Sequence, residues 1–155
     1  MIRRTAREMA LQALFQLDVY ENVKKNLSLE SVGEIDYSDF TAEAALGAAF
    51  AEREDEEGLK AQDYAEFLVK GVLAARGAID ERISQFAVDW SLDRMLAADR
   101  NILRIAVFEC LEPSNNQRVD ASVAINEAVE IAKLYGSDES PRFINGVLGK
   151  MVRLA

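Results

Sequence analysis

The most apolar segment of the chain is MLAADRNILRIAVFECL, residues 95–111. Its second half is apolar on nearly every side, a pattern typical of a helix that is surrounded by other elements in a core. The turn-forming residues Pro113, Ser114, Asn115 and Asn116 follow it and are expected to end it. We therefore expect this segment to form a helix at the centre of the fold.

Two further helices are predicted after this segment. Residues 122–134 carry apolar side chains at helical spacing, and Gly136 follows as the expected left-handed terminator. A last helix is predicted from Ser140, with Gly146 and Gly149 inside it. Each internal glycine costs about 0.5–1 kcal/mol relative to alanine, so the sequence predicts that a neighbouring helix approaches closely there.

The first helix is predicted to begin near residue 5. Thr5 and Glu8 match a capping box, in which the two side chains satisfy the first free amides of a helix. On this interpretation Arg3 and Arg4 lie on a mobile tail before the helix, and Arg7 lies in its first turn.

The rest of the N-terminal half has weaker patterns. Residues 21–40 are mixed in composition and are expected to form a loop with at most a turn of helix. Residues 41–57 are rich in alanine and then acidic, which suits a helix with a solvated acidic end. Residues 61–75 and 79–87 repeat apolar side chains at helical spacing.

No stretch alternates convincingly with period two, so the predicted fold is all-α. We expect a compact bundle of about six or seven helices that forms a single domain over residues 1–155. Within it, the pattern favours two helical subdomains at about 1–75 and 76–155.

Composition excludes several kinds of chemistry. Histidine is absent from the 155 residues, which excludes Ser–His and Cys–His nucleophile pairs and histidine-bound metals. Cys110 is the only cysteine, so an internal disulfide and a thiolate metal cluster are excluded as well. Residues 146–150 combine glycine with lysine but lack the spacing of a phosphate-binding loop. We therefore expect no enzymatic activity, no cofactor and no metal.

The sequence predicts a soluble cytoplasmic protein. No segment approaches the roughly 20 apolar residues that a membrane span requires. The N-terminus carries Arg3, Arg4 and Arg7, but Glu8 and Gln12 interrupt the apolar region that a secretory signal would need.

Charge is distributed unevenly along the chain. The formal net charge is −9, and residues 21–66 alone account for −9, against +1 for residues 1–20 and −1 for residues 67–155. A binding site responds to the local potential within about a Debye length, ~8–10 Å, rather than to the total charge. Basic patches at either end of the chain are therefore compatible with the acidic composition.

The arginines at the N-terminus point to an anionic ligand. Arg3, Arg4 and Arg7 surround the predicted start of a helix, whose dipole places positive charge at that end. Three cations are unfavourable there unless an anion binds to them.

Several sequence strings occur together and in a specific order: RRTARE (3–8), ALQALFQ (10–16), LVKGV (68–72), WSLDR (90–94), DRNILRIA (99–106), VAINEAVEIAK (123–133) and FINGVLGK (143–150). Each string alone indicates only an amphipathic helix, but in combination they resemble the NusB family of bacterial transcription antitermination factors. The match covers residues 3–18 and 61–152, whereas residues 19–60 match poorly.

The resemblance implies an RNA-binding protein without enzymatic activity. Members of this family have an all-helical fold of two subdomains. They bind the boxA element of nascent ribosomal RNA transcripts together with a small-subunit ribosomal protein, known in that role as NusE. Other Nus factors and RNA polymerase are then engaged indirectly, and premature termination is suppressed.

The resemblance also implies which residues contact RNA. These are Arg3, Arg4, Arg7, Phe86, Lys133, Tyr135, Arg142 and Phe143. Cationic groups bind phosphates, and aromatic rings stack unpaired bases at ~1–3 kcal/mol per base. The alternatives are that the arginines form a solvated terminus and that the aromatic residues belong to the core.

For the protein partner, the resemblance points to Phe15 on the first helix and Asp99 at the start of the central helix. Asp99 would pair with a basic group of NusE. The alternatives are that Phe15 lies in the core and that Asp99 caps a helix. Weak self-association through the RNA-facing surface is a further expectation.

Two departures from the family pattern stand out. The loop 112–121 is about three residues longer than expected, and the N-terminal arginine tail is short, which is expected to lower the affinity for RNA without the partner. Two other functions remain open: an accessory domain like the one found in certain ribosomal RNA cytosine methyltransferases, and a purely protein-binding scaffold.

Overall fold

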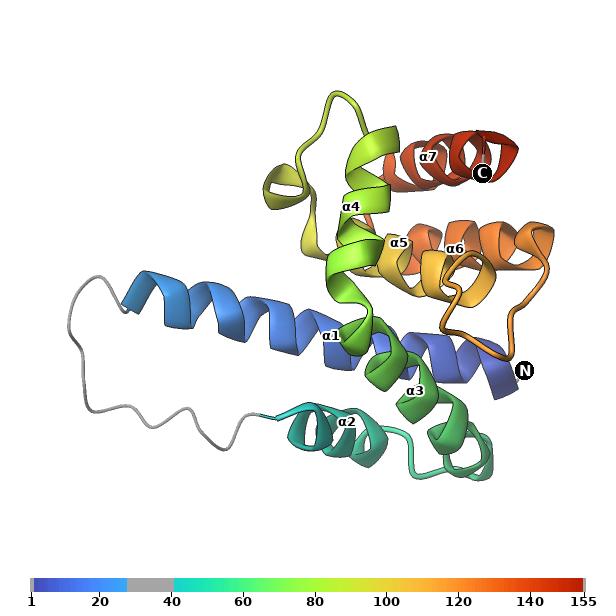
Figure 1. Cartoon of the computed structure of the whole chain (residues 1–155). Helices are drawn as coiled ribbons and strands as arrows, with labels where there is room; N and C mark the ends of the chain where they lie inside the picture. Colours follow the sequence, from blue (N-terminus) through green and yellow to red (C-terminus); the bar gives the residue numbers. More distant parts are fainter. Residues whose placement is uncertain (1, 28–40, 155) are drawn as a thin grey trace. The chain divides into compact units, whose positions relative to one another are not determined.

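The computed structural model describes residues 2–27 and 41–154 (Figure 1). Over these ranges the chain forms seven α-helices, one 3₁₀ helix and no strand, which confirms the predicted all-α fold. The elements in chain order are α1 (Ile2–Leu27), α2 (Ala42–Ala51), α3 (Glu56–Ala74), α4 (Arg76–Phe86), η1 (Leu92–Arg94), α5 (Ala97–Cys110), α6 (Ala121–Tyr135) and α7 (Ser140–Leu154).

The chain divides into two compact units, residues 1–69 and 70–155. The boundary lies inside α3, a little before the division that the sequence suggested between residues 75 and 76. Among the described residues, no helix is both long enough and apolar enough to cross a membrane.

The first unit packs its helices through small side chains. One buried cluster combines residues of α1, α2 and α3, and Phe50 and Tyr64 pack against it: its members are Ala6, Met9, Ala49, Ala61 and Ala65. Helix axes come closest where the side chains at the contact are small. The alanine-rich composition of this half therefore serves close helix packing.

The first helix begins earlier than predicted. α1 starts at Ile2, so Arg3 and Arg4 lie in its first turn and not on a tail before it. Thr5 is a buried residue within the helix, so the predicted capping box with Glu8 is wrong. Burial of Thr5 stabilises the first turns by packing, which a prediction based on capping residues overlooks.

The first helix also ends later than predicted. α1 continues through Leu27, so the prediction of a loop is wrong for residues 21–27, and residues 28–40 lie outside the described residues. The helix predicted over residues 41–57 is two helices. α2 begins after Thr41, whose hydroxyl accepts a hydrogen bond from the amide of Ala44 at 3.2 Å, and the chain turns at residues 52–55 before α3.

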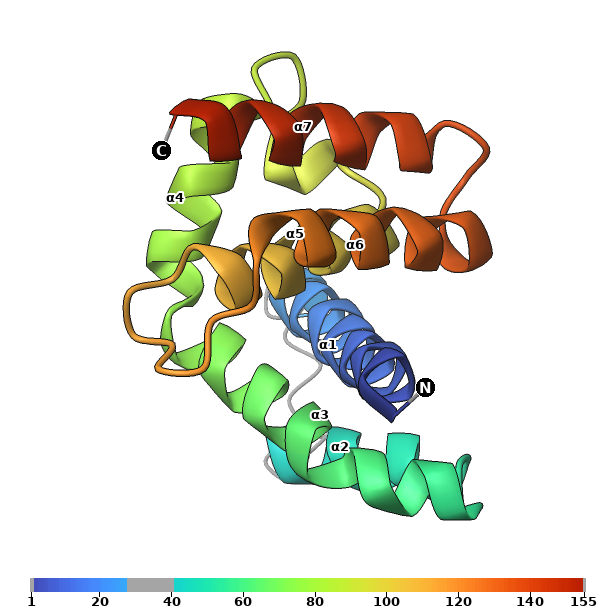
Figure 2. The ribbon, with the colours of Figure 1, turned by 90° about the vertical axis from the view of Figure 1, so that its right-hand side faces the viewer.

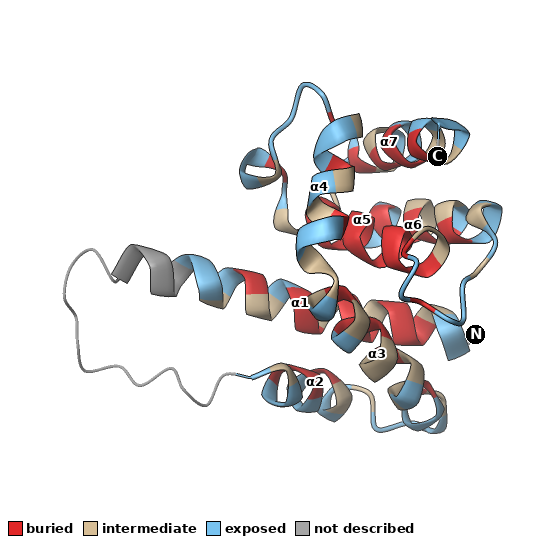
Figure 3. Ribbon diagram, viewed as in Figure 1, coloured by how far each residue is buried: buried red, intermediate tan, exposed pale blue. Residues whose placement is uncertain are grey.

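In the second unit α5 lies at the centre, as predicted. α4, α6 and α7 all pack against it. Figure 2 shows α6 and α7 side by side, with α4 crossing near their ends. Every residue from Asp99 to Glu109 is buried, which Figure 3 shows as the red helix in the middle of this unit.

The arginines of this central helix have specific partners. Arg104 makes a two-pronged ion pair with Asp80 of α4, with Nε–Oδ1 at 2.8 Å and Nη2–Oδ2 at 3.0 Å. Arg100 donates from Nη1 to the carbonyl oxygens of Leu92 at 2.6 Å and Met95 at 3.3 Å. Buried charges are tolerated when they are paired and hydrogen-bonded in this way. These contacts attach α4 and the η1 turn to α5.

Cys110 ends α5 and is partly buried. Burial, together with the nearby charge of Glu109, raises the pKa of its thiol to about 11. The thiol is therefore protonated at neutral pH and behaves as a small apolar group.

The glycines differ from the expectation. A Cβ at Gly146 or Gly149 would meet nothing within 4 Å, so the predicted close helix approach at these two positions is wrong.

Gly136 has φ −98° and ψ −167°, an extended conformation and not the predicted left-handed one. Its role is to leave room, since a Cβ there would lie 2.5 Å from the Ser140 side chain. The true close approach is at Gly71, where a Cβ would lie 2.0 Å from the ring of Phe108.

Substitution of Gly71 tests this packing. Because Phe108 is buried and cannot swing away, we expect Gly71→Ala to lower the free energy of unfolding by about 1–3 kcal/mol, the usual cost of overpacking a core. The matched control is Gly146→Ala, which has open space around it and should raise the free energy of unfolding by about 0.5–1 kcal/mol. Urea denaturation measures both. Equal effects of the two substitutions would contradict the assignment.

Candidate nucleic-acid interface

Three arginines occupy the first two turns of α1 and form the arginine cluster: Arg3, Arg4 and Arg7. Arg3 is exposed and Arg4 is half-buried, whereas only 4% of Arg7 is exposed. No acidic residue lies in the first turn of the helix. The positive end of the helix dipole therefore adds to their charge, as the sequence predicted.

The ring of Tyr64 on α3 holds two of these arginines. The guanidinium carbon of Arg3 lies 4.5 Å from the centroid of the ring, and that of Arg7 lies 6.0 Å from it. Tyr64 in turn stacks on Phe67, with 5.8 Å between the ring centroids. Attraction between a cation and an aromatic face is worth about 0.5–1 kcal/mol at exposed sites and more when the cation is desolvated. It orients both guanidinium groups over the ring.

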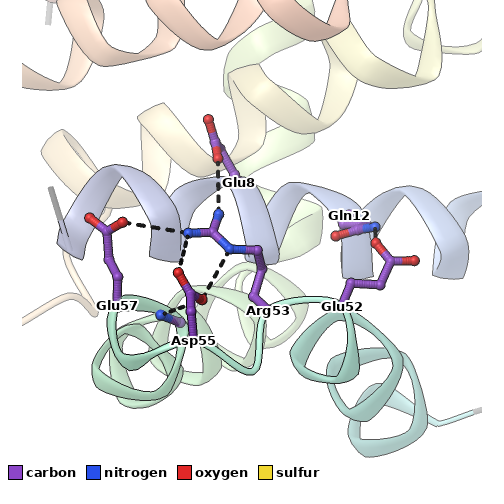
Figure 4. Close-up of polar contacts among 7 residues, drawn as sticks. Glu8, Gln12, Glu52, Arg53, Asp55 and Glu57 are labelled. Carbon is purple, nitrogen blue, oxygen red and sulfur yellow. Dashed lines mark hydrogen bonds and ion pairs between the residues drawn. The ribbon is translucent and has the colours of Figure 1, made fainter.

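An acidic segment, residues 52–57, lies beside α1 and is organised by one arginine. Figure 4 shows that Arg53 points toward Glu8 of α1, while Asp55 and Glu57 turn toward Arg53. Glu52 of the same segment accepts a hydrogen bond from the side-chain amide of Gln12 on α1. Two contacts thus attach the acidic segment to the first helix.

The distances show that the guanidinium of Arg53 bridges three carboxylates. Its Nε lies 3.4 Å from Oδ1 of Asp55, and its Nη2 lies 3.5 Å from Oε2 of Glu57. Its Nη1 lies 3.9 Å from Oε2 of Glu8. The hydrogen bond from Arg53 holds the pKa of Asp55 below its ordinary value. Burial raises the pKa of Glu8, and the charges of Arg53 and Arg4 oppose that shift.

Local geometry fixes where Arg53 stands. Asp55 caps α3, because its Oδ1 accepts a hydrogen bond from the amide of Gly58 at 3.2 Å. A Cβ at Gly58 would lie 2.1 Å from the carbonyl oxygen of Arg53, so only glycine allows this close approach. The turn before α3 is therefore well defined.

The second unit contains a pocket of about 270 Å³, here called the Asp99 pocket. It is lined by Trp90, Arg94, Met95, Leu96, Asp99, Ser137, Glu139, Ser140 and Phe143. Phe143 is half-buried, and Trp90 is 53% exposed. The sequence assigned Phe143 to RNA and Asp99 to a protein partner, and the structure places both residues around one pocket.

Asp99 is the unusual polar group of this pocket. It is only 7% exposed, and its Oδ1 has no hydrogen-bond partner among the residues that the structure describes. Burial raises the pKa of its carboxyl, and a hydrogen bond with Ser140 partly offsets that shift. Leu96 and not Asp99 occupies the N-cap position of α5, which excludes the capping alternative. A buried acceptor without a partner is costly unless a ligand supplies a donor.

The remaining predicted residues lie at several places. Arg142 is exposed and borders an open groove with Ser122, Asn126 and Asn145, while its neighbour Phe143 faces the Asp99 pocket. The structure thus separates these two adjacent residues.

Two predicted residues lie together at the end of α6. Lys133 is exposed and pairs with Glu130 at 2.9 Å, and Tyr135 is 51% exposed. Phe86 is half-buried at the end of α4. In the first unit Phe15 is 42% exposed, so it is not a core residue.

The sequence did not single out Tyr64, Arg53 or Trp90 as site residues. Tyr64 lies in the apolar pattern of α3, which resembles core packing. Arg53 is the one cation within the acidic run of residues 52–57, and this position was the sequence feature that could have pointed to a role for it. Trp90 lies in the connector between α4 and η1 and is exposed there, and an exposed large aromatic residue is a feature that could have marked it.

The pKa of Asp99 gives a test by pH. A carboxyl with a raised pKa in the folded state contributes stability that is present below the unfolded value and is lost as the pH rises through the folded value. We therefore expect Asp99→Asn to be more stable than the parent at pH 7, with an advantage that shrinks as the pH falls toward the ordinary range of an aspartate. Urea midpoints measured from pH 4 to pH 7 would show it. A variant that is less stable at pH 7 would refute the assignment.

Comparisons with known proteins show which family the chain belongs to. The sequence profile of the NusB family matches residues 4–153. The transcription antitermination protein NusB of Bacillus pumilus is 39% identical over 151 residues, which cover 97% of this chain and 95% of the relative. The protein of the same name from Anaeromyxobacter dehalogenans is 43% identical over 150 residues, with coverage of 96% and 89%.

Solved structures show the same fold. NusB of T. maritima is 31% identical, with a TM-score of 0.73 and coverage of 97% of this chain and 90% of that chain. A complex of the antitermination factors NusB and NusE with double-stranded RNA contains a chain that is 22% identical, with a TM-score of 0.73 and coverage of 99% and 98%. The relatives are named for transcription antitermination, a role without catalysis. The chain belongs to the NusB family.

Proposed function

We propose that this antitermination factor binds the boxA element of nascent ribosomal RNA transcripts together with the ribosomal protein NusE. In this role it helps RNA polymerase to avoid premature termination, with other Nus factors and the polymerase engaged indirectly. The observation that carries the proposal is the arginine cluster at the start of α1, in which the guanidinium groups of Arg3 and Arg7 lie against the ring of Tyr64.

Electrostatics support an RNA ligand at the arginine cluster. A helix N-terminus offers free amides and a positive dipole end, and here it also offers Arg3 and Arg4. Tyr64 holds the guanidinium of Arg3 in place, which reduces the ordering that a phosphate would otherwise have to impose. Arg7 is buried, so its proposed role is to support the cluster and its potential.

In the second unit the aromatic residues suit unpaired bases. Phe143 presents part of its ring to the Asp99 pocket, and Tyr135 is exposed at the end of α6. Arg142 and Lys133 add exposed cations for phosphates, and Phe86 is a half-buried aromatic candidate at the end of α4. Stacking of this kind tolerates different bases.

For the protein partner, Asp99 and Phe15 remain the proposed contacts. The partnerless Oδ1 of Asp99 would accept a hydrogen bond from a basic side chain of NusE. Exposed Trp90 and Leu96 border the same pocket and offer apolar area around that contact. A solved complex of the family's NusB with NusE and RNA supports joint binding.

Removal of the two outer arginines tests RNA binding. We expect Arg3→Ala with Arg4→Ala to weaken binding to boxA RNA in the presence of NusE by at least about tenfold, because two charged contacts are lost. The slope of log K against log salt should fall in magnitude by about 1.4, the value for two phosphates on a single strand. Fluorescence anisotropy over a KCl series measures both quantities.

This double variant retains Arg7, whose substitution would disturb the buried packing of α1. Circular dichroism of the variant checks that the helices are intact. If affinity and salt slope remain those of the parent, the proposed RNA site is wrong.

A second test addresses the protein partner. We expect Asp99→Asn to weaken binding to NusE about tenfold or more, since a charge-assisted hydrogen bond is worth about 1.5–3 kcal/mol. The same substitution is expected to stabilise the free protein, and urea denaturation of the variant checks that a loss of binding is not caused by unfolding. Isothermal titration calorimetry with purified NusE gives the affinity, and unchanged affinity would remove Asp99 from the interface.

A further inference from the structure

We propose that Arg53 is a positioning residue for the RNA site: its guanidinium gathers the carboxylates of Glu8, Asp55 and Glu57 and thereby limits their repulsion of a nucleic acid at the arginine cluster. This inference rests on the proposed function. It gives a role to the acidic segment, residues 52–57, for which the sequence predicted only a solvated acidic end.

The negative charge of residues 52–57 is the reason for this proposal. The segment 52–57 reads EREDEE, with five carboxylates and one cation. It is attached to α1 through the contacts of Glu52 with Gln12 and of Arg53 with Glu8. Charges within about one Debye length, ~8–10 Å, act on a phosphate with little screening. An acidic segment at this location would oppose the binding of a polyanion.

One of the carboxylates stands next to the arginine cluster, and a second lies on the helix that carries Tyr64. Glu8 follows Arg7 directly and lies one helical turn after Arg4, whose charge acts on the Glu8 carboxyl together with that of Arg53. Glu57 lies seven residues before Tyr64 on α3, which places both on one face of that helix. Tyr64 is the ring that holds Arg3 and Arg7. Arg53 therefore bridges carboxylates from both helices that build the RNA site.

The bridge has a fixed location. The Asp55 cap and the close approach of Gly58 to the backbone of Arg53 define the turn from which the guanidinium extends. Arg53 binds Asp55 with two nitrogens, at 3.4 Å and 3.5 Å. An arginine suits this task because its planar group presents several donors in a rigid arrangement.

Stability alone does not account for the bridge. The side chains of Arg53, Asp55 and Glu57 are 33%, 56% and 37% exposed, and ion pairs at such sites contribute little to folding. A change in the local electrostatic potential acts on every nearby phosphate, so it changes the affinity for RNA.

The test compares RNA affinities of charge variants in the full-length protein with NusE present. Arg53→Gln should weaken binding to boxA RNA about three- to tenfold at low salt, with a smaller effect at high salt. Arg53→Lys keeps the charge and should retain most of the affinity. Arg53→Gln combined with Asp55→Asn and Glu57→Gln removes the exposed carboxylates as well, and should restore binding to the parent level or above. Asparagine keeps the ability to cap α3.

Arg153→Gln serves as the matched control, because it removes one exposed cation from the last turn of α7 and changes the net charge equally. Its effect on affinity should be smaller than that of Arg53→Gln. Thermal melting monitored by circular dichroism should show similar stability for all variants.

A second readout needs no RNA. Burial raises the pKa of Glu8 and the charge of Arg53 opposes that shift, so Arg53→Gln should raise the pKa of that carboxyl further, measured by NMR titration. Arg53→Lys should leave it closer to the parent value. A merely structural role for the guanidinium predicts instead that lysine and glutamine variants behave alike.

The outcomes separate the two claims. If the parent protein does not bind boxA RNA with NusE, the proposed function fails and this inference fails with it. If the parent binds and Arg53→Gln binds equally well, the inference alone is overturned. It is overturned also if the triple variant stays as weak as Arg53→Gln, since removal of the carboxylates would then have no effect. Recovery in the triple variant supports it.

Discussion

The contact of Arg3 and Arg7 with the ring of Tyr64 is the interaction on which the arrangement of the arginine cluster in the first unit depends. Like charges at the positive end of a helix repel one another and the helix dipole. The electron-rich face of an aromatic ring attracts such cations and offsets part of this repulsion. Tyr64 also packs against the alanine-rich cluster of the three helices. One side chain therefore contributes both to the packing of the unit and to the orientation of its arginines.

The second unit follows a different principle. α5 is buried along most of its length, and the paired arginines Arg100 and Arg104 attach its surroundings to it. At the start of the same helix, Asp99 is buried with one oxygen left without a partner. The chain thus satisfies most of the buried polar groups of this helix and leaves one of them available at a pocket with aromatic walls.

Much of the fold was predictable because helical periodicity and burial are properties of local sequence. The all-α class and the central position of residues 95–111 followed from the apolar pattern alone. The start of α1 and the break at residues 52–55 did not, because packing of Thr5 and the contact of Gly58 with Arg53 are tertiary effects. Gly146 and Gly149 were misinterpreted because a glycine in a helix pattern does not reveal whether a neighbour approaches. For the site, residue types named the candidates, but only geometry could bring Tyr64 to the arginines or Asp99 to Phe143.

The partly buried thiol of Cys110 has a practical consequence. With a pKa of about 11, only about one molecule in ten thousand carries the thiolate at pH 7, and the thiolate is the form that reacts with peroxides and electrophiles. We therefore expect the single sulfhydryl of this chain to react slowly with peroxides and alkylating agents at neutral pH.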